Sequence, residues 1–181
     1  MTMDSAQMVE RCRRHDKKAQ RALYDMIAPM VGGICARYSS CHAEAQDMMQ
    51  DVFVKVFERI GTLNDSANIM SWTYSMAVNT CIDQLRRRRH WQPIDETVSE
   101  VPSLDRDPFV MADIVAAMQQ LTPMLRTVFN LCDVEGYSLD EVAERIGSNN
   151  LAVRVALHRA RKELRSLLED KHNKLRTNEQ K

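Results

Sequence analysis

Residues 138–165 read SLDEVAERIGSNNLAVRVALHRARKELR, and this stretch decides the fold of the C-terminal part of the chain. Ser138 followed three residues later by Glu141 forms a capping box, which predicts the start of a helix. Gly147 favours a tight turn that would end this short helix after about two turns. A short capped helix, a glycine turn and a longer basic helix are typical of a helix-turn-helix.

The second helix of this motif is expected to run from about Asn150 to Asp170, with Asn149 as its cap. Its first turns would enter the major groove, where Asn and Arg side chains can form paired hydrogen bonds with bases. The base-reading candidates are Asn149, Asn150, Arg154 and His158. Basic side chains farther along would contact phosphates: Arg159, Arg161, Lys162 and Arg165. The inward-facing positions would be Leu139, Val142, Ala143, Ile146, Leu151, Val153 and Leu157. The alternative is a surface helix of a bundle whose charges are only solvated.

The segment that precedes this motif differs in composition. Thr122-Pro123 and Asp107-Pro108 each predict a helix start, because the first residue can cap and proline fits the first turn. Gly136 would close the helix that Thr122 opens. Residues 93–107 contain prolines and acidic residues without helical periodicity, which predicts a flexible acidic linker.

The helix predicted over residues 71–90 has an apolar face, from Tyr74 to Leu85, and an opposite polar edge. That edge carries Ser75, Asn79, Asp83 and Arg86. The helix runs into four consecutive arginines, Arg86 to Arg89. Several arginines that neutralise phosphates would give strong, salt-sensitive DNA binding. The alternative is a charge block that only keeps the protein in solution.

A further helix is predicted over residues 43–60 and would end at Gly61. Asp47, Asp51 and Lys55 lie in one row beside Val54 and Phe57, which could form an apolar partner-binding surface with an acidic rim. The alternative is a helix with an Asp51–Lys55 ion pair. Residues 6–38 predict two helices, with a kink at Pro29 and weak helix formation at Gly32-Gly33.

The composition favours an all-α fold of two small helical domains. The chain has 181 residues, of which 44% are hydrophobic and only five are glycine. It contains no apolar run of ~18 residues and no apolar N-terminal stretch, so we expect a cytoplasmic protein without membrane insertion. The five scattered cysteines are expected as free thiols. No phosphate loop, nucleophile elbow or metal-ligand cluster is present, so neither an enzyme, a cofactor, a metal nor a small-molecule substrate is expected.

These motifs, in this order, resemble those of an extracytoplasmic-function sigma factor of bacterial RNA polymerase, over roughly residues 19–170. Residues 45–53 (AQDMMQDVF) resemble the family's polymerase-binding helix. Residues 71–87 (SWTYSMAVNTCIDQLRR) resemble its helix that reads the minus-ten element. Residues 121–126 (LTPMLR) resemble the opening of its C-terminal domain, and residues 137–161 resemble its minus-thirty-five helix-turn-helix.

The resemblance implies the roles of individual residues. Residues 1–92 would bind core polymerase and the minus-ten element, 93–107 would be the linker, and 108–181 would bind the minus-thirty-five element. The residues expected to dock the beta-prime clamp helices are Asp47, Gln50, Asp51 and Phe53. Those expected at the minus-ten element are Asn64, Trp72, Asn79, Asp83, Arg86, Arg87, Arg88 and Arg89. The loop 63–70, together with Asn79 and Asp83, would capture a base flipped from the non-template strand. Those expected at the minus-thirty-five element are Arg126, Asn149, Asn150, Arg154, His158 and Arg161. The implied partners are core polymerase (its beta and beta-prime subunits), promoter DNA and an anti-sigma factor.

Two departures from the family pattern concern the helix-turn-helix. Ser148 replaces an apolar residue in the turn, and Ala156 stands where a base-contacting residue is common, which predicts altered reading of the upstream element. Two other functions remain open. One is a helix-turn-helix regulator that acts without replacing a sigma factor. The other is a zinc or redox sensor built on Cys35, Cys41 and His42, although their spacing does not match tight zinc pairs.

Overall fold

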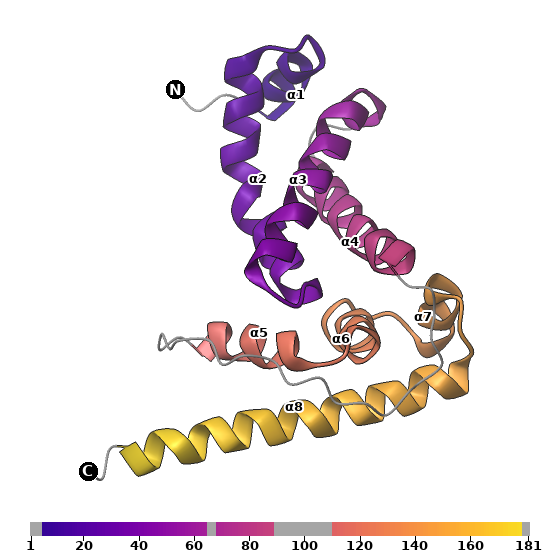
Figure 1. Ribbon diagram of the computed structural model, residues 1–181. Coiled ribbons are helices and arrows are strands. Elements are labelled where there is room, and N and C mark those ends of the chain that lie inside the picture. Colours follow the sequence, from indigo (N-terminus) through magenta and orange to yellow (C-terminus); the bar gives the residue numbers. More distant parts are fainter. Residues whose placement is uncertain (1–4, 65–67, 89–109, 179–181) are drawn as a thin grey trace. The chain divides into compact units, whose positions relative to one another are not determined.

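The computed structural model describes residues 5–64, 68–88 and 110–178. All regular elements within these ranges are helical, which confirms the all-α prediction (Figure 1). The chain divides into two compact units, Met1–Gln84 and Leu85–Lys181. The predicted acidic linker, residues 93–107, and the helix start predicted at Asp107 lie outside the described residues.

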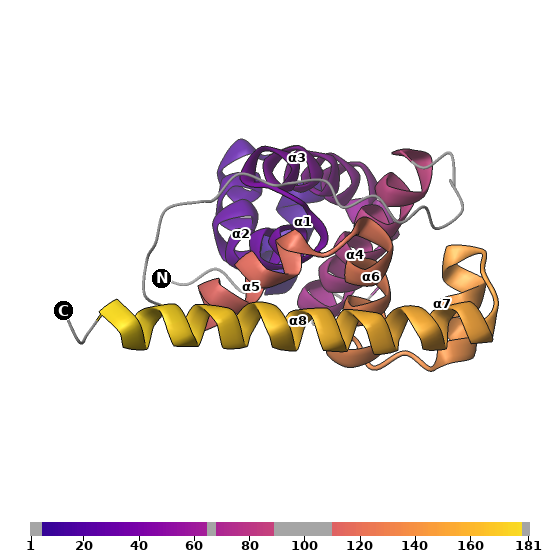
Figure 2. The same ribbon diagram turned by 60° about the horizontal axis from the view of Figure 1, so that its bottom comes forward.

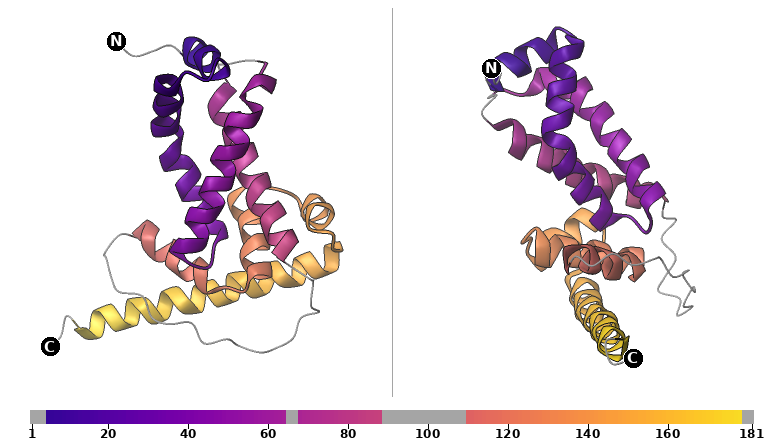
Figure 3. Two further views of the ribbon diagram at one scale, coloured as in Figure 1. Left: turned by 45° about the horizontal axis from the view of Figure 1, so that its top comes forward. Right: turned by 90° about the vertical axis from the view of Figure 1, so that its left-hand side faces the viewer.

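The N-terminal unit is built on helices α1 (Ser5–Arg13), α2 (Lys17–Tyr38), α3 (His42–Arg59) and α4 (Ile69–Arg88), the last of which continues into the second unit. Helices α2 and α3 lie side by side, and α1 packs against one end of α2 (Figures 1 and 3). Asp16 begins α2 by accepting hydrogen bonds from the N–H groups of Lys18 and Ala19. The buried face of α2 follows the helical repeat and carries Ala19, Leu23, Ile27, Val31 and Ile34.

Two glycine predictions in this unit need correction. Helix α2 continues through the Gly32-Gly33 pair to Tyr38, with Pro29 inside it, because its long apolar face is buried along the whole length; the kink at Pro29 stays a prediction. Helix α3 ends at Arg59, and the single turn of 3-10 helix Ile60–Thr62 follows it. Gly61 therefore lies inside that turn and does not adopt the left-handed conformation expected of a helix-ending glycine.

A pair of buried thiols joins α2 to α4 in the core of this unit. The Sγ atoms of Cys35 and Cys81 are 4.0 Å apart, and both residues are fully buried free thiols. The thiol of Cys81 donates to Cys35, and this hydrogen bond together with burial raises the pKa of Cys81. The structure thus confirms the interpretation of Cys81 as a core residue of an apolar helical face.

The C-terminal unit contains helices α5 (Val110–Gln120), α6 (Pro123–Phe129), α7 (Leu139–Ile146) and α8 (Asn150–Asn178). Helices α5, α6 and α7 all pack along α8, which forms the long axis of this unit (Figure 2). A core of Ala117 and Met118 from α5 and Leu121 from the turn after it meets Ala160 and Leu164 from α8. Thr122 caps α6 and Pro123 occupies its first turn, as the sequence predicts.

Two features of this unit were not predicted. A π-helical segment, Asn130–Val134, extends α6 before the chain turns at Gly136, which has φ +78°. Helix α8 ends at Asn178, beyond the predicted end at Asp170. Its C-terminal extension is polar, so the apolar repeat that sets the predicted length gave no sign of it.

Candidate nucleic-acid interface

The helix-turn-helix forms with the local hydrogen bonds that the sequence predicts. Ser138 Oγ accepts from the N–H of Glu141 at 3.3 Å, and Glu141 Oε2 accepts from the N–H of Ser138 at 2.8 Å. Gly147 ends α7 in the left-handed conformation, with φ +67°, where a side chain would be strained. Asn149 Oδ1 accepts from the N–H of Ala152 at 2.8 Å and so caps α8. These bonds set where α7 begins and ends and where α8 begins.

The capping box makes the stability of this unit depend on pH. The hydroxyl of Ser138 donates to the Glu141 carboxylate, and this bond is the main reason why the pKa of Glu141 lies below its usual value of 4.5. A lowered carboxylate pKa stabilises the fold above the unfolded value, and this stabilisation is lost as the pH falls through the lowered pKa. We expect Ser138→Ala to lower the melting temperature of the C-terminal unit at neutral pH, and by a smaller amount well below pH 4.5. Thermal unfolding at both pH values measures this; an equal difference at both would contradict the proposed contribution of Glu141.

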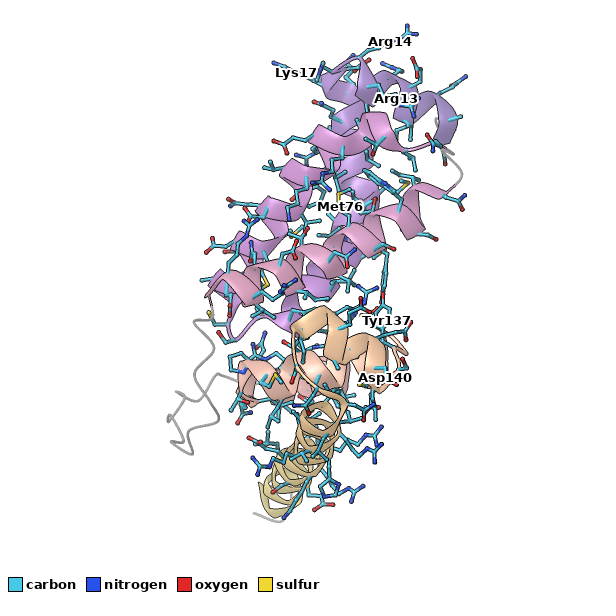
Figure 4. All side chains as sticks on the ribbon, turned by 90° about the vertical axis from the view of Figure 1, so that its right-hand side faces the viewer. Arg13, Arg14, Lys17, Met76, Tyr137 and Asp140 are labelled. Atoms are coloured by element: carbon cyan, nitrogen blue, oxygen red, sulfur yellow. The ribbon has the colours of Figure 1, made fainter. Side chains whose placement is uncertain are left out.

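Both asparagines predicted to read bases already form hydrogen bonds within the helix-turn-helix. Asn149 Oδ1 is the cap of α8, as described above. Asn150 Nδ2 donates to Asp140 Oδ1 at 2.7 Å, linking the starts of α8 and α7. Asp140 lies in the first turn of α7 and Tyr137 just before it (Figure 4), and the Arg145 guanidinium stacks 4.2 Å above the Tyr137 ring. A paired adenine contact needs both the oxygen and the amide nitrogen of an asparagine, so each would have to share an atom that is already bonded.

The outward face of α8 differs from the prediction at two positions. Its buried positions are Val153, Ala156, Leu157, Ala160 and Leu164. Ala156 therefore belongs to the core, and its interpretation as a missing base contact is wrong. Leu151, predicted to face inward, has 70% of its surface exposed, because it falls outside this buried repeat. The predicted readers Arg154 and His158 are exposed, as DNA contacts must be.

Arg161 is exposed but already holds an acidic partner within the unit. Its Nε donates to Asp133 Oδ2 at 2.8 Å and its Nη2 to Asp133 Oδ1 at 2.5 Å. This paired interaction joins α8 to the π-helical segment and raises the pKa of Arg161. A phosphate contact by Arg161 would therefore compete with Asp133, and its DNA-binding role stays a prediction.

The predicted DNA contact of Arg126 is wrong. Its side chain is only 2% exposed, and it donates to three backbone carbonyls at the end of α5 and in the turn after it. The acceptors are Met118 O at 2.9 Å, Gln119 O at 3.0 Å and Leu121 O at 2.8 Å. The last carbonyls of a helix have no hydrogen-bond donors within the helix, and here the guanidinium donates to them. Arg126 is a structural cap.

Helix α4 presents the polar edge that the sequence predicts. Asn79, Asp83, Arg86 and Arg87 are exposed, whereas Val78, Cys81, Ile82 and Leu85 are buried on the other side. Asn64, in the loop before α4, is exposed, and Trp72 is half-buried. The side chain of Arg88 and the whole of Arg89 lie outside the described residues. Asp83 follows Asn79 by one helical turn, and Arg86 and Arg87 follow Asp83 by about one more, so the edge combines an amide, a carboxylate and two cations. This mixture suits contacts with both bases and backbone better than a purely electrostatic contact.

The residues predicted to bind polymerase divide into an exposed and a buried set. Asp47, Gln50 and Asp51 are exposed on α3, and Gln84 Nε2 of α4 donates to Asp51 Oδ2. Phe53 is only 7% exposed, so its assignment to the docking surface is corrected: its ring lies 4.3 Å from Tyr24 and 6.3 Å from Phe57, measured between centroids.

The exposed apolar residue of α3 is instead Val54, with 54% of its surface accessible. It lies on the same face as Asp47 and Asp51 because it follows them by seven and three residues. We call the exposed set Asp47, Gln50, Asp51 and Val54 the α3 docking edge. The helical register of the sequence already indicated that Val54 could be exposed, since this residue falls beside the main apolar stripe.

The arrangement of Cys35, Cys41 and His42 gives no support to the alternative of a zinc or redox sensor. Cys35 is buried beside Cys81, whereas Cys41 and His42 are exposed at the start of α3. Within residues 5–64, 68–88 and 110–178, no three His, Cys, Asp or Glu side chains are grouped closely enough to hold a metal ion. No helix in the same ranges is both long and apolar enough for a membrane span.

Comparison with known proteins finds similarity in both units. Residues 23–90 match the family model of sigma-70 region 2, and residues 111–164 match that of sigma-70 region 4. The chain is 31% identical over 165 residues to RNA polymerase sigma factor CarQ of Myxococcus xanthus, covering 88% of this chain and 95% of that protein. It is 24% identical to the ECF RNA polymerase sigma factor SigW of Bacillus subtilis, covering 94% of this chain and 100% of that protein. Among solved structures, the sigma factor RpoE from a complex with the anti-sigma factor NepR of Bartonella quintana has a TM-score of 0.49 and 21% identity, covering 82% of this chain and 96% of that one.

Proposed function

Because this chain belongs to the sigma-70 family, as an extracytoplasmic-function sigma factor that directs promoter-specific transcription initiation by RNA polymerase, we propose that three of its exposed helical surfaces each bind a different component of the initiation complex. The α3 docking edge binds the beta-prime clamp helices of core polymerase. The polar edge of α4 binds the minus-ten element. The helix-turn-helix of α7 and α8 binds the minus-thirty-five element.

The observation that carries this proposal is the polar edge of α4. Asn79 and Asp83 are exposed one turn apart, and Arg86 and Arg87 follow them toward the end of the helix. The buried side of the same helix holds the edge rigid, since Ala77, Cys81 and Ile82 are packed into the core. Amide and carboxylate groups can select a base that has left the stack, while the arginines hold the adjacent phosphates.

Core polymerase supplies the chemistry in this proposal, and the chain supplies positioning and promoter selection. The surfaces described are exposed helical edges, which suit binding to protein and DNA. An anti-sigma factor that covers one of these edges is part of the same proposal; its support is membership of the family.

Run-off transcription with bacterial core polymerase and a library of promoter fragments tests the role of α4. We expect the unaltered protein to give promoter-specific transcripts, and the double variant Asn79→Ala with Arg86→Ala to lose about tenfold or more of them. The reason is that each specific base or backbone contact contributes about 1–3 kcal/mol. The matched control is Gln7→Ala with Arg14→Ala, because Gln7 is exposed on α1, Arg14 is exposed in the turn directly after it, and both lie outside the matched family region.

Two outcomes would overturn the proposal. Equal transcript yields from the α4 double variant and the α1 control would show that the α4 edge does not read the promoter. If the unaltered protein gave no transcripts with core polymerase but bound duplex DNA alone, an independent helix-turn-helix regulator would explain the chain better.

A further inference from the structure

An apolar pair stands at the start of α8, where the helix-turn-helix would meet base edges. Leu151 is 70% exposed and Val155 is 41% exposed, although both are large hydrophobic residues. They lie four residues apart and therefore on the same side of the helix, one turn above the other. His158 and Lys162 continue this outward stripe toward the phosphate-binding end.

In the first turns of α8, polar side-chain atoms that could read bases already form hydrogen bonds within the protein. The asparagines at positions 149 and 150 cap α8 and bond Asp140, so each already uses one of the two atoms that an adenine contact needs. Arg154 is exposed beside the apolar pair and can contact guanine or a phosphate. Leu151, with 70% of its surface exposed, is the most exposed large hydrophobic residue among those that the structure describes, and it lies in these turns.

The basic residues near the pair indicate which ligand it would contact. Arg154 lies between Leu151 and Val155 in the sequence, and His158, Arg159 and Lys162 follow Val155 within two helical turns; all four are exposed. An apolar pair followed by basic side chains on the same helix fits the major groove, where apolar methyl groups lie between rows of phosphates. In the major groove the exposed apolar group of a base is the C5-methyl of thymine.

We propose that Leu151 and Val155 recognise thymine in the upstream promoter element by contact with its C5-methyl group. The proposal rests on the promoter-binding role of α7 and α8 given above, and it names the chemistry by which that site selects its sequence. Burying one methyl group corresponds to about a fourfold change in affinity, so each contacted thymine should be preferred over deoxyuridine by about that factor.

The test uses holoenzyme reconstituted from the full chain and core polymerase, with promoters selected by transcription from a library randomised upstream. Each thymine of the selected upstream element is replaced in turn by deoxyuridine, which removes only the methyl group. Competition binding then gives the ratio of the affinities for the thymine and deoxyuridine promoters. We expect a ratio of about four at one or two positions for the unaltered protein, falling to about one for Leu151→Ala.

Two further variants separate this role from general weakening. Val134→Ala shortens another exposed valine of the same unit and should leave the ratio unchanged. Arg154→Ala should weaken both promoters equally. A ratio near one at every thymine for the unaltered holoenzyme, or an unchanged ratio in Leu151→Ala, would overturn the inference while leaving promoter binding intact. Absence of any promoter-specific binding would overturn the proposed function itself, and the inference with it.

Discussion

Replacement of Arg126 by methionine is expected to destabilise the C-terminal unit by about 3 kcal/mol or more. The guanidinium is buried and donates to the carbonyls of Met118, Gln119 and Leu121. Methionine fills a similar volume but donates nothing, so all three carbonyls would lose the guanidinium, and Met118 O would keep only the N–H of Leu121, which donates to it at 3.1 Å. Each such loss costs about 1–3 kcal/mol in a buried site, and part of that cost is relieved by local rearrangement. A loss of this size is a large share of the total stability of a small domain.

Hydrogen exchange of the full chain, read by mass spectrometry over α6 and α8, would measure this loss in the unit concerned. Arg159→Met is the matched control, because Arg159 is exposed on α8 and its replacement should change little. The variant Arg126→Lys should be intermediate, since an ammonium cannot donate along the plane of a guanidinium to three acceptors. If Arg126→Met weakened promoter binding without faster exchange in α6 and α8, the structural role assigned to this residue would be wrong.

The predictions that the structure confirms rest on bonds between residues close in sequence. The capping box at Ser138 and Glu141, the left-handed turn at Gly147 and the cap at Asn149 each involve partners within about four residues. Such bonds are readable from sequence because the backbone fixes which atoms meet. They place the helix-turn-helix before anything is known of its packing.

The predictions that fail depend on which way a side chain faces in the folded unit. Arg126 looks like a DNA contact, because arginine is rarely buried, yet its acceptors lie on the preceding helix and turn. Phe53 and Leu151 are similar cases. Phe53 is buried because its ring packs against Tyr24 of another helix. Leu151 is exposed because it falls outside the buried repeat of α8, which includes two alanines. Counting Ala156 and Ala160 as core residues would have shown that Leu151 faces outward. Tertiary contacts such as that of Phe53 with Tyr24 have no such local sign.

Replacement of Val54 by arginine is expected to reduce affinity for core polymerase by about a hundredfold. Val54 is the exposed apolar residue of the α3 docking edge, between the acidic groups at positions 47 and 51 and Glu58. At the centre of a protein interface such a residue would lose contact with water, and burying a charged guanidinium there costs about 3 kcal/mol, which corresponds to about a hundredfold in affinity. The new cation would also neutralise the acidic rim, which is the feature that complements a basic partner surface.

Titration of labelled protein with core polymerase, followed by fluorescence anisotropy, gives this affinity. Because Val54 is exposed, the variant should keep the melting temperature of the unaltered protein, which separates lost docking from lost folding. Val134→Arg introduces the same change at an exposed valine of the other unit and should leave core affinity nearly unchanged. A stable Val54→Arg protein that bound core polymerase as tightly as the control would place the docking surface elsewhere. The exposed acids of α3 would then serve only the helix itself, as the alternative of an Asp51–Lys55 ion pair along that helix allows.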